Sequence, residues 1–541
     1  MTRWLPAAVP VLWVGLWSLV FSAGCFERGG QVKGEPDDAA PPIAAVARLP
    51  EVQDPDGAPD REATIRVRLE AEPAHLNPLI GGDAVALRVA LGDVYEGLLC
   101  RATPTAMPVV CLAEWVRESD GGTVVRARLR DGVRFHDGAP LTIGDAVFSF
   151  ELVRGGGGAL GWLTAAFDDL REVRGLADGL LELRFAGPRP GRQELLAQVP
   201  ILPRHVFGAD AAAGTMLAAP ANRAPVGTGP LRFVRWTSGQ SIALDRWDGY
   251  WGESARAAHI EYRVVPSRAR ALLELGAGRL DVAVQLPVDE ALDAAERLPR
   301  VRAFGYELPA YLAAVHDQRN PVLADVRVRR ALGLLLDRPG IARRLFRGYA
   351  QPIAGPFLPD LPGADLAPLP YDRAAAAALL AETGLARPRL VVLTPAGSRT
   401  MGRIADIWAS DARPFVNLVI ETVPYADLLA RVRAGRFDIA LLAFTTAREP
   451  DLYSRFHSAE IGGENYGALR DDAIDRLLEA FRAEADPARR AALQAELGAR
   501  LAELQPYTFI AGDTRLGLAR ADIGGLAEGG GLAARKLWRA R

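Results

Sequence analysis

The chain has 541 residues, and its 64 Lys and Arg nearly balance its 66 Asp and Glu, for a formal net charge of −2. This balance offers no electrostatic reason for binding nucleic acid or an anionic membrane surface. The length of the chain predicts two or more domains. With 49% hydrophobic residues, 54 Gly and 39 Pro, the composition is typical of a loop-rich α/β protein with large cores.

The N-terminus is predicted to be a lipoprotein-type signal peptide, residues 1–25. A single basic residue, Arg3, precedes an apolar run from Trp4 to Gly24, and small residues lead up to Cys25. Ser22 departs from the usual cleavage site, where a larger aliphatic residue is found. We expect lipid on Cys25, with an uncleaved membrane anchor or ordinary secretion as alternatives. In each case the body lies outside the cytoplasm, in the periplasm or at the cell surface.

Residues 26–63 are predicted to be a disordered tether. They are rich in Pro, Gly, Asp and Ala and have no periodic apolar face. Such a segment cannot bury enough surface to fold. It would let the folded body stand away from the membrane.

Two cysteines remain once Cys25 is assigned to lipid. Cys100 and Cys111 bracket a segment in which two prolines favour a turn. In an oxidising compartment we expect them to form a disulfide, which would stabilise the fold by ~2–3 kcal/mol through restriction of the unfolded chain. Two buried thiols are the alternative, and the sequence has no CxxC or Cys/His zinc pattern.

The body begins with a predicted strand at 64–69, where apolar and polar residues alternate. A polar, Pro-bounded loop follows, and then a helix predicted through 84–95 and hairpins between 98 and 130. Further strands are predicted at 180–185, 231–236 and 241–246.

After residue 266 the sequence predicts helices alternating with short strands. Helix starts are indicated by N-capping aspartates, at Asp325, Asp337, Asp372 and Asp486. Strands are predicted at 280–285, 418–422 and 437–444. This alternation predicts an α/β architecture, and the chain has no internal repeat.

The string LRDGVRFHDGAPLTIGDAVFSFE, at 129–151, predicts a strand end, a tight turn and a capped helix. Thr142 is expected to cap the helix, with Asp145 at its third position, where a carboxylate meets free backbone N–H groups. The string closely resembles a signature of the extracellular solute-binding proteins of family 5. These are the peptide- and nickel-type receptors of ABC importers.

Further strings resemble motifs of the same family and follow the family's order over roughly residues 64–525. They are YEGL at 95–98, LAEW at 112–115, VGTGP at 226–230 with Trp236, YWG at 250–252, VRVRRAL at 326–332 with Asp337-Arg338, and FDIA at 437–440.

The resemblance implies a two-lobed periplasmic-binding-protein clamshell, type II, cluster C. It places lobe I at 64–310, with an extra subdomain at about 95–220, and lobe II at 311–507. Residues 508–541 would return to lobe I and form the C-terminal tail. Hinges are expected near 306–317 and 507–514.

The resemblance also implies a monomeric receptor that delivers a ligand, by default a peptide, to an ABC permease and ATPase complex, with no cofactor and no catalytic centre. The residues agree with this. The six histidines form no HxxxH or HExxH pattern, no GxSxG elbow occurs, and the glycines at 227 and 229 lack the Lys of a phosphate loop. We expect His136 to be structural, holding its turn by hydrogen bonds. We therefore predict neither an enzyme nor a metal site.

The resemblance places ligand contacts after the FDIA strand. Phe444 stands where peptide-binding members of the family have a Trp, and the polar Thr445 follows. The family's Asp that pairs with the peptide ammonium is missing, because Thr446 or Ala447 falls at its position. A buried ammonium without a charged partner is costly by several kcal/mol, so a free amino terminus is not expected to be the main recognition feature.

Other cleft positions follow from the same resemblance. Tyr425 matches a second aromatic of the cleft wall, and core packing is the alternative for this ring as for Phe444. Arg431 or Arg433 lies close to where another basic contact occurs, and Leu441 replaces an Arg of some oligopeptide binders. His75 lies in a loop that faces the cleft in the family, with a solvated loop as the alternative.

The ligand class stays open at this point. A displaced carboxylate, Glu449 or Asp451, could substitute for the missing Asp. Otherwise the same receptor fold would take a non-peptide solute such as a nickel chelate, an opine or a glycoside. A sensor or scaffold lipoprotein that has lost import is the alternative outside transport, and a secreted hydrolase has no supporting motif.

Overall fold

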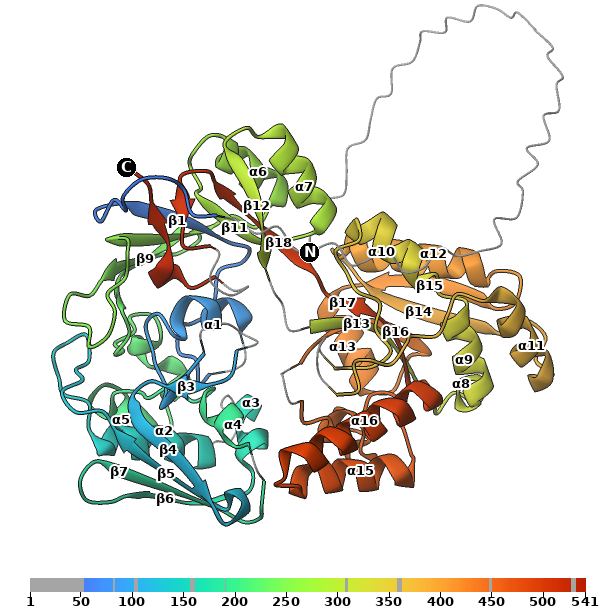
Figure 1. Cartoon of the computed structure of the whole chain (residues 1–541), viewed down its shortest axis with the longest axis horizontal. Coiled ribbons are helices and arrows are strands. Elements are labelled where there is room, and N and C mark those ends of the chain that lie inside the picture. The colour runs from blue at the N-terminus through green and yellow to red at the C-terminus, as the bar shows by residue number, and fades with distance from the viewer. Residues whose placement is uncertain are drawn as a thin grey trace, which may run out of the picture. The chain divides into compact units, whose positions relative to one another are not determined.

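A computed structural model of the chain describes residues 53–80, 83–101, 106–155, 161–189, 191–306, 310–357, 362–446, 450–526 and 532–541. The predicted signal peptide, Cys25 and most of the predicted tether lie outside these residues. Within the described ranges, no helix is both long and apolar enough to cross a bilayer. Three sheets of four or more strands organise the body, and helices pack on them (Figure 1).

A seven-stranded sheet is built around the first predicted strand. That strand, β1, pairs in parallel with β10 and with β11, and Ile65, Val67 and Leu69 on it are fully buried. Helices α6 (Arg268–Gly276) and α7 (Val288–Arg297) pack on this sheet. The order is β12 (Val301–Tyr306), β18 (Arg515–Arg520), β11 (Val282–Leu286), β1 (Thr64–Leu69), β10 (His259–Val264), β9 (Ser241–Arg246), β8 (Leu231–Thr237).

An antiparallel four-stranded sheet lies within the predicted extra subdomain. Helix α2 (Ile143–Gly155) packs on its strand β6 and also contacts α5 (Arg204–Ala213). The strand order is β4 (Ala113–Ser119), β5 (Val124–Leu129), β7 (Leu180–Phe185), β6 (Leu170–Gly175). Shorter elements nearby are α1 (Ala84–Ala90), β2 (Leu99–Cys100), β3 (Val109–Val110), α3 (Gly161–Thr164) and α4 (Gln193–Leu196).

A five-stranded sheet forms the core of the predicted second lobe. Its order is β15 (Asn417–Val423), β14 (Arg389–Pro395), β16 (Ile439–Thr445), β13 (Ala310–His316), β17 (Tyr507–Gly512). The helices of this part are α8 (Pro321–Ala324), α9 (Val326–Leu334), α10 (Arg338–Phe346), α11 (Arg373–Thr383), α12 (Arg399–Ala412), α13 (Tyr425–Arg433), α14 (Tyr453–Phe456), α15 (Asp472–Ala483) and α16 (Pro487–Leu504).

The chain returns from the five-stranded to the seven-stranded sheet between β17 and β18. Because β17 pairs with β13, residues through Gly512 belong to the five-stranded sheet, and the crossing lies at 513–514. The predicted return at 508 is therefore a few residues early. An apolar strand that continues the five-stranded sheet is not distinguishable by sequence from one that begins the next sheet. The other crossing includes residues 307–309, which lie outside the described ranges.

The last residues of the predicted tether are ordered against the C-terminus, which differs from the prediction. The Asp60 N–H donates to the Arg539 carbonyl over 2.8 Å, and Gly525 N–H donates to the Asp54 carboxylate over 2.7 Å. Residues 53–63 lack an apolar periodicity of their own. Their partners come from β20 (Trp538–Arg539) and from Gly525, which directly follows β19 (Ile523–Gly524), and a local pattern cannot reveal them.

The predicted N-caps are confirmed. The carboxylates of Asp325, Asp337, Asp372 and Asp486 each accept a hydrogen bond from a backbone N–H in the first turn of the following helix. At α2 the roles differ from the prediction. Asp145 reaches back and accepts from both the backbone N–H and the hydroxyl of Thr142, over 2.8 and 2.6 Å. This is the reciprocal half of a capping box, with Asp in the position that Glu usually takes.

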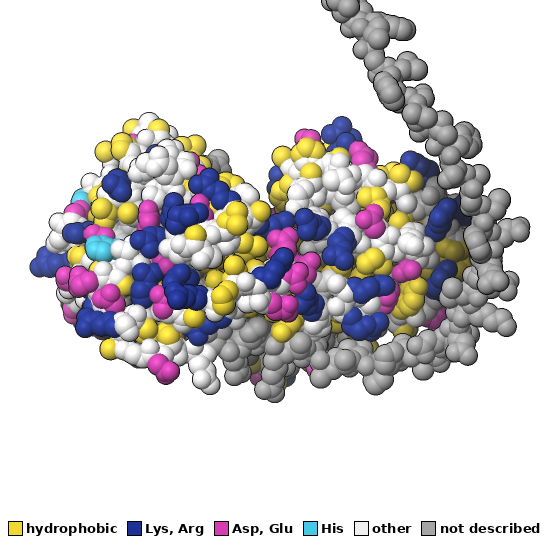
Figure 2. Space-filling model, turned by 90° about the horizontal axis from the view of Figure 1, so that it is seen from above, with side chains coloured by type: hydrophobic (Ala, Val, Ile, Leu, Met, Phe, Trp, Pro, Cys, Tyr) yellow, Lys and Arg dark blue, Asp and Glu magenta, His cyan; other side chains and the backbone are white. Residues whose placement is uncertain are grey.

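Basic and acidic side chains are interspersed on the face that Figure 2 displays, as the near-zero net charge leads one to expect. The mixture gives this face no broad region of one sign that would attract a polyanion.

His136 is structural, as predicted. Its Nδ1 accepts from the Gly227 N–H at 3.2 Å, so its Nε2–H donates to the Gly229 carbonyl at 2.9 Å. Burial lowers the pKa of His136 to about 4, so the ring is neutral near pH 7. The imidazole thus joins the turn at 135–138 to the glycine-rich turn at 227–229.

Both glycines of that second turn lie directly against another segment of backbone. A Cβ on Gly227 would lie 1.9 Å from the Val94 carbonyl oxygen, and one on Gly229 would lie 2.3 Å from that of Asp93. Real Cβ atoms do not approach backbone so closely. These glycines are therefore required by contact with 93–95, and no ligand needs to be invoked.

We predict that Gly227→Ala lowers the free energy of unfolding by about 3 kcal/mol or more, because rigid backbone must move to admit the methyl group. Gly402→Ala is the matched control. Gly402 lies inside α12, where an added Cβ meets nothing within 4 Å. Its replacement should stabilise by about 0.5–1 kcal/mol through helix propensity. Urea unfolding of both variants measures this, and equal effects would contradict the contact argument.

Candidate functional site

Three of the family-like motifs, those at 95–98, 226–230 and 250–252, meet at the buried carboxylate of Glu96, which is only 1% exposed. It accepts hydrogen bonds from the Tyr250 hydroxyl at 2.7 Å, the Trp251 indole N–H at 3.0 Å and the Thr228 hydroxyl at 3.0 Å. Burial raises the pKa of Glu96, while these donors oppose the shift. Strings that lie up to 155 residues apart in sequence thus converge on one group in the core.

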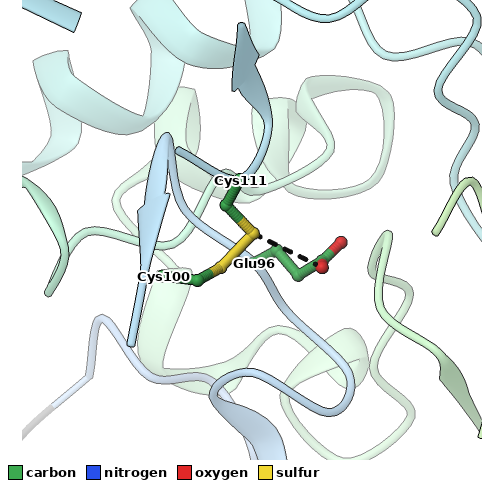
Figure 3. Close-up of side chains that lie close together, drawn as sticks. All are labelled: Glu96, Cys100 and Cys111. Carbon is green, nitrogen blue, oxygen red and sulfur yellow. Dashed lines mark hydrogen bonds between the residues drawn. A yellow bond between two sulfur atoms is a disulfide. The ribbon is translucent and has the colours of Figure 1, made fainter. Parts of the chain in front are cut away.

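Cys100 and Cys111 form a disulfide beside this carboxylate, with their Cα atoms 5.4 Å apart. Figure 3 shows the Glu96 carboxylate pointing toward the Cys111 sulfur, and its Oε1 lies 3.5 Å from that sulfur. A disulfide sulfur carries no hydrogen, so this contact is a close approach with no donated proton. The three groups also lie close enough for metal ligation. However, a disulfide removes both thiolates, so the arrangement does not make a metal site.

A cavity of about 620 Å³ lies where the predicted ligand residues Thr445 and Thr446 end strand β16. One wall comes from the extra subdomain and includes Arg189 and Gln198. The opposite wall comes from the five-stranded-sheet part and includes Arg455. Its size is in the range that encloses small ligands in proteins. Polar groups from both parts face the same space, which is the arrangement that a bound ligand could bridge.

Aromatic rings support the β16 side of the cavity. Phe444 stacks between Tyr311 and Tyr507, with ring centroids 5.4 Å from each, and is 7% exposed. It therefore packs in the core and does not line the cavity, one of the two placements the sequence allowed. The Arg455 guanidinium lies 4.9 Å above the Phe444 ring, between that ring and the cavity.

Arg455 is positioned by two hydrogen bonds. It donates to the Tyr311 hydroxyl over 3.1 Å and to the Thr445 carbonyl over 2.7 Å. It has no carboxylate partner within the described part of the chain. No sequence pattern points to this residue, because α14 is a single turn with no family-like motif around it.

Asp451 lies on the same wall and is held by two arginines. Arg482 contacts both carboxylate oxygens, over 2.7–3.0 Å, and Arg189 reaches it from the extra subdomain over 2.6 Å. Burial alone would raise the pKa of Asp451, but the hydrogen bonds and charge of Arg482, with the charge of Arg189, bring it below its usual range. Arg189 and Asp451 lie 262 positions apart in the sequence, and their ion pair joins the two walls of the cavity.

Four of the predicted ligand residues lie away from this cavity. Tyr425 is 54% exposed at the start of α13, and Arg433 is exposed at its end. Arg431 forms an ion pair with Glu421 at 2.7 Å. His75 is half-buried, burial lowers its pKa, and its Nδ1 has no hydrogen-bond partner. Their roles in binding stay predictions.

Thr446 is the predicted residue whose side chain has a defined role at the cavity. Its hydroxyl donates to the Pro356 carbonyl over 3.2 Å and so ties the end of β16 to a neighbouring loop. Ala447, the alternative occupant of the missing Asp position, and Glu449, predicted as a displaced substitute for that Asp, lie outside the described residues.

Two other cavities fit a ligand less well. The larger, about 740 Å³, lies between α6, α7 and residues 397–399, and its Glu290 is already paired with Arg268 at 3.0 Å and Arg399 at 3.7 Å. A smaller one, about 370 Å³, borders Glu96 and the disulfide. Neither contains a predicted ligand residue, so we take the 620 Å³ cavity as the candidate site.

Comparison with known proteins shows a family match over most of the body. Residues 108–464 match the model for bacterial extracellular solute-binding proteins, family 5. Among curated proteins, protein XP55 of Streptomyces lividans is 28% identical over 480 residues, covering 84% of each chain. The oligopeptide-binding protein AppA of Bacillus subtilis is 24% identical over 484 residues, covering 84% of this chain and 87% of its own.

Solved structures show the same fold. The B. subtilis AppA structure, in complex with a nonapeptide, superposes with a TM-score of 0.75 at 23% identity, covering 90% of this chain and all of AppA. NikZ from Campylobacter jejuni, in complex with Ni(L-His), also gives a TM-score of 0.75, at 21% identity, covering 88% of this chain and 99% of NikZ. The α/β, two-lobed fold predicted from the sequence is thereby confirmed.

We predict that Glu96→Ala lowers the free energy of unfolding by about 3–4 kcal/mol, since it leaves three donors unpaired, the buried Thr228 and the half-buried Tyr250 and Trp251. Glu96→Gln should cost about 1–2 kcal/mol or less, because its amide oxygen can accept from two donors and its N–H groups can donate to the Tyr250 hydroxyl. Urea unfolding of both variants tests this. If the Gln variant is as unstable as the Ala variant, the carboxylate charge matters more than the number of hydrogen bonds.

Proposed function

The chain belongs to the bacterial extracellular solute-binding proteins, family 5, and on this basis we propose that it is an extracytoplasmic receptor for an ABC importer. It binds a short peptide in the 620 Å³ cavity and presents it to a permease and ATPase complex. The observation that carries the proposal is the cavity, with polar groups from both parts of the molecule facing one space. The peptide ligands named for AppA give the ligand class.

The receptor acts by binding and not by catalysis. Several charged groups of the cavity are guanidiniums and carboxylates engaged with one another, such as Asp451 with Arg189 and Arg482. Among the described residues of the cavity wall, none forms a nucleophile–base pair of the kind that acyl transfer or hydrolysis requires. A ligand that touches both walls would favour the state in which they lie together, and differential contact is what couples binding to recognition by a transporter.

A non-peptide solute is the second candidate. The observation that favours it comes from the sequence: Thr446 or Ala447, and not an Asp, stands where the family resemblance leads one to expect an ammonium partner. NikZ, whose structure contains Ni(L-His), shows that this fold also takes a chelated metal. A nickel chelate, an opine or a glycoside would then replace the peptide.

Purification of the full chain without denaturant, followed by mass spectrometry of released small molecules, tests the ligand class. We expect a series of short peptides. An Ala166→Trp variant, which adds a large ring to the cavity wall, should lose them, whereas Gly402→Ala should retain them. Recovery of a single non-peptide solute would show that the ligand is not a peptide. If the Ala166→Trp variant still retains peptides, they bind outside this cavity.

We further propose that Cys25 carries lipid and anchors the receptor at a membrane, with the body as a monomer outside the cytoplasm. Small residues before Cys25 and the Pro- and Gly-rich segment after it support this. Cys25→Ala should move the protein from the membrane fraction to the soluble extracytoplasmic fraction, because a lipid chain then no longer holds it. Retention of the variant in the membrane would instead indicate an uncleaved anchor.

A further inference from the structure

We infer that Arg455 binds a carboxylate of the ligand, and that the receptor does not require a free ammonium on it. This inference rests on the proposed function and names the ligand chemistry of the same cavity. For a peptide, recognition would centre on the carboxyl end, not on the amino end.

Asp451 has little capacity left for an ammonium. Its two oxygens offer roughly four lone-pair positions. They already receive bonds from Arg482 and Arg189 over 2.6–3.0 Å and from the Tyr453 N–H over 3.1 Å. A ligand ammonium would have to displace a guanidinium. Arg189 thus supplies, from the protein itself, the cation that a ligand ammonium would otherwise provide.

Arg455, in contrast to Asp451, still has hydrogen-bonding groups that a ligand could use. A guanidinium has five N–H donors, and Arg455 uses two of them, on the Tyr311 hydroxyl and the Thr445 carbonyl. One face of the group lies over the Phe444 ring, which removes water from that side. A half-buried cation without a carboxylate partner in the described part of the chain gains most from an incoming anion.

The remaining acidic residues on the cavity wall do not reverse this preference. Glu194 is paired through Oε2 with Arg101, whose charge offsets its own, although the buried Oε1 of Glu194 has no hydrogen-bond partner among the described residues. Glu464 is exposed and accepts from the Ser454 hydroxyl at 2.9 Å, and Glu460 is half-buried. Charges on an exposed rim are screened by water and attract an ammonium only weakly.

The chemistry of the site favours a monoanionic carboxylate over a phosphate. One planar guanidinium matches the two oxygens of a carboxylate. A dianion would need further free cations, and it would meet Glu460 and Glu464 at the rim. The carboxylate can come from a peptide C-terminus or from an acidic solute, and the test separates these sources.

A random tripeptide library in three forms provides the test, with thermal unfolding of the purified full chain as the measurement. We expect the free and the N-acetylated library to raise Tm equally, and the C-amidated library to raise it little. Calorimetry on one binding tripeptide should then show at least about tenfold weaker affinity for its amide than for its free acid, because a charge-assisted bidentate contact is lost.

Arg455→Met keeps much of the side-chain stem and removes the charge. It should bind free and amidated peptides equally, while Arg343→Met, at an exposed position of α10, should discriminate as the parent chain does. Arg455→Lys should restore part of the preference. The library comparison needs no variant, so it stands even if a variant fails to fold.

The outcomes separate the inference from the proposed function. If acetylation abolishes binding and amidation does not, the inference is overturned and the peptide receptor stands. If no peptide binds but glutarate raises Tm in the parent chain and not in Arg455→Met, the carboxylate site is supported and the peptide class is replaced. If neither peptides nor glutarate bind, both are overturned.

Discussion

The buried carboxylate of Glu96 is the constraint on which the first part of the fold depends. A charged or strongly polar group at 1% exposure is tolerated only when donors surround it, and Thr228, Tyr250 and Trp251 provide them. Thr228 comes from one loop and the neighbouring Tyr250 and Trp251 from another, so these two loops can adopt only positions that satisfy the carboxylate. The close backbone contacts of Gly227 and Gly229 with 93–95 set the distance between them.

The motif residues that make the family recognisable are therefore not among those that line the candidate cavity. His136 and Glu96 hold turns together in the interior, and the polar atoms of their side chains form hydrogen bonds within the protein. The cavity is lined instead by Arg189, Arg455 and Asp451, which lie outside every motif string. A shared interior can thus carry different ligand chemistries, as AppA and NikZ illustrate within one fold.

Charge pairing across the cavity connects ligand recognition with the arrangement of the two walls. Arg189 and Asp451 form an ion pair that joins the two walls. A pair of this kind is favourable when the walls are together and is lost to water when they separate. Ligand contacts at Arg455 would add to it, so binding and wall approach stabilise each other.

The sequence by itself determined the local features: β1 from its alternation, the helix starts from their capping aspartates, and the family from its ordered motifs. These depend on interactions within a few residues or on strings that can be compared directly. Only the tertiary structure decided that Phe444 packs in the core, that Asp451 is paired with Arg189, and that residues 53–63 dock on the C-terminus. Each depends on a partner more than 60 residues away, and neither composition nor periodicity encodes which distant side chain will arrive there.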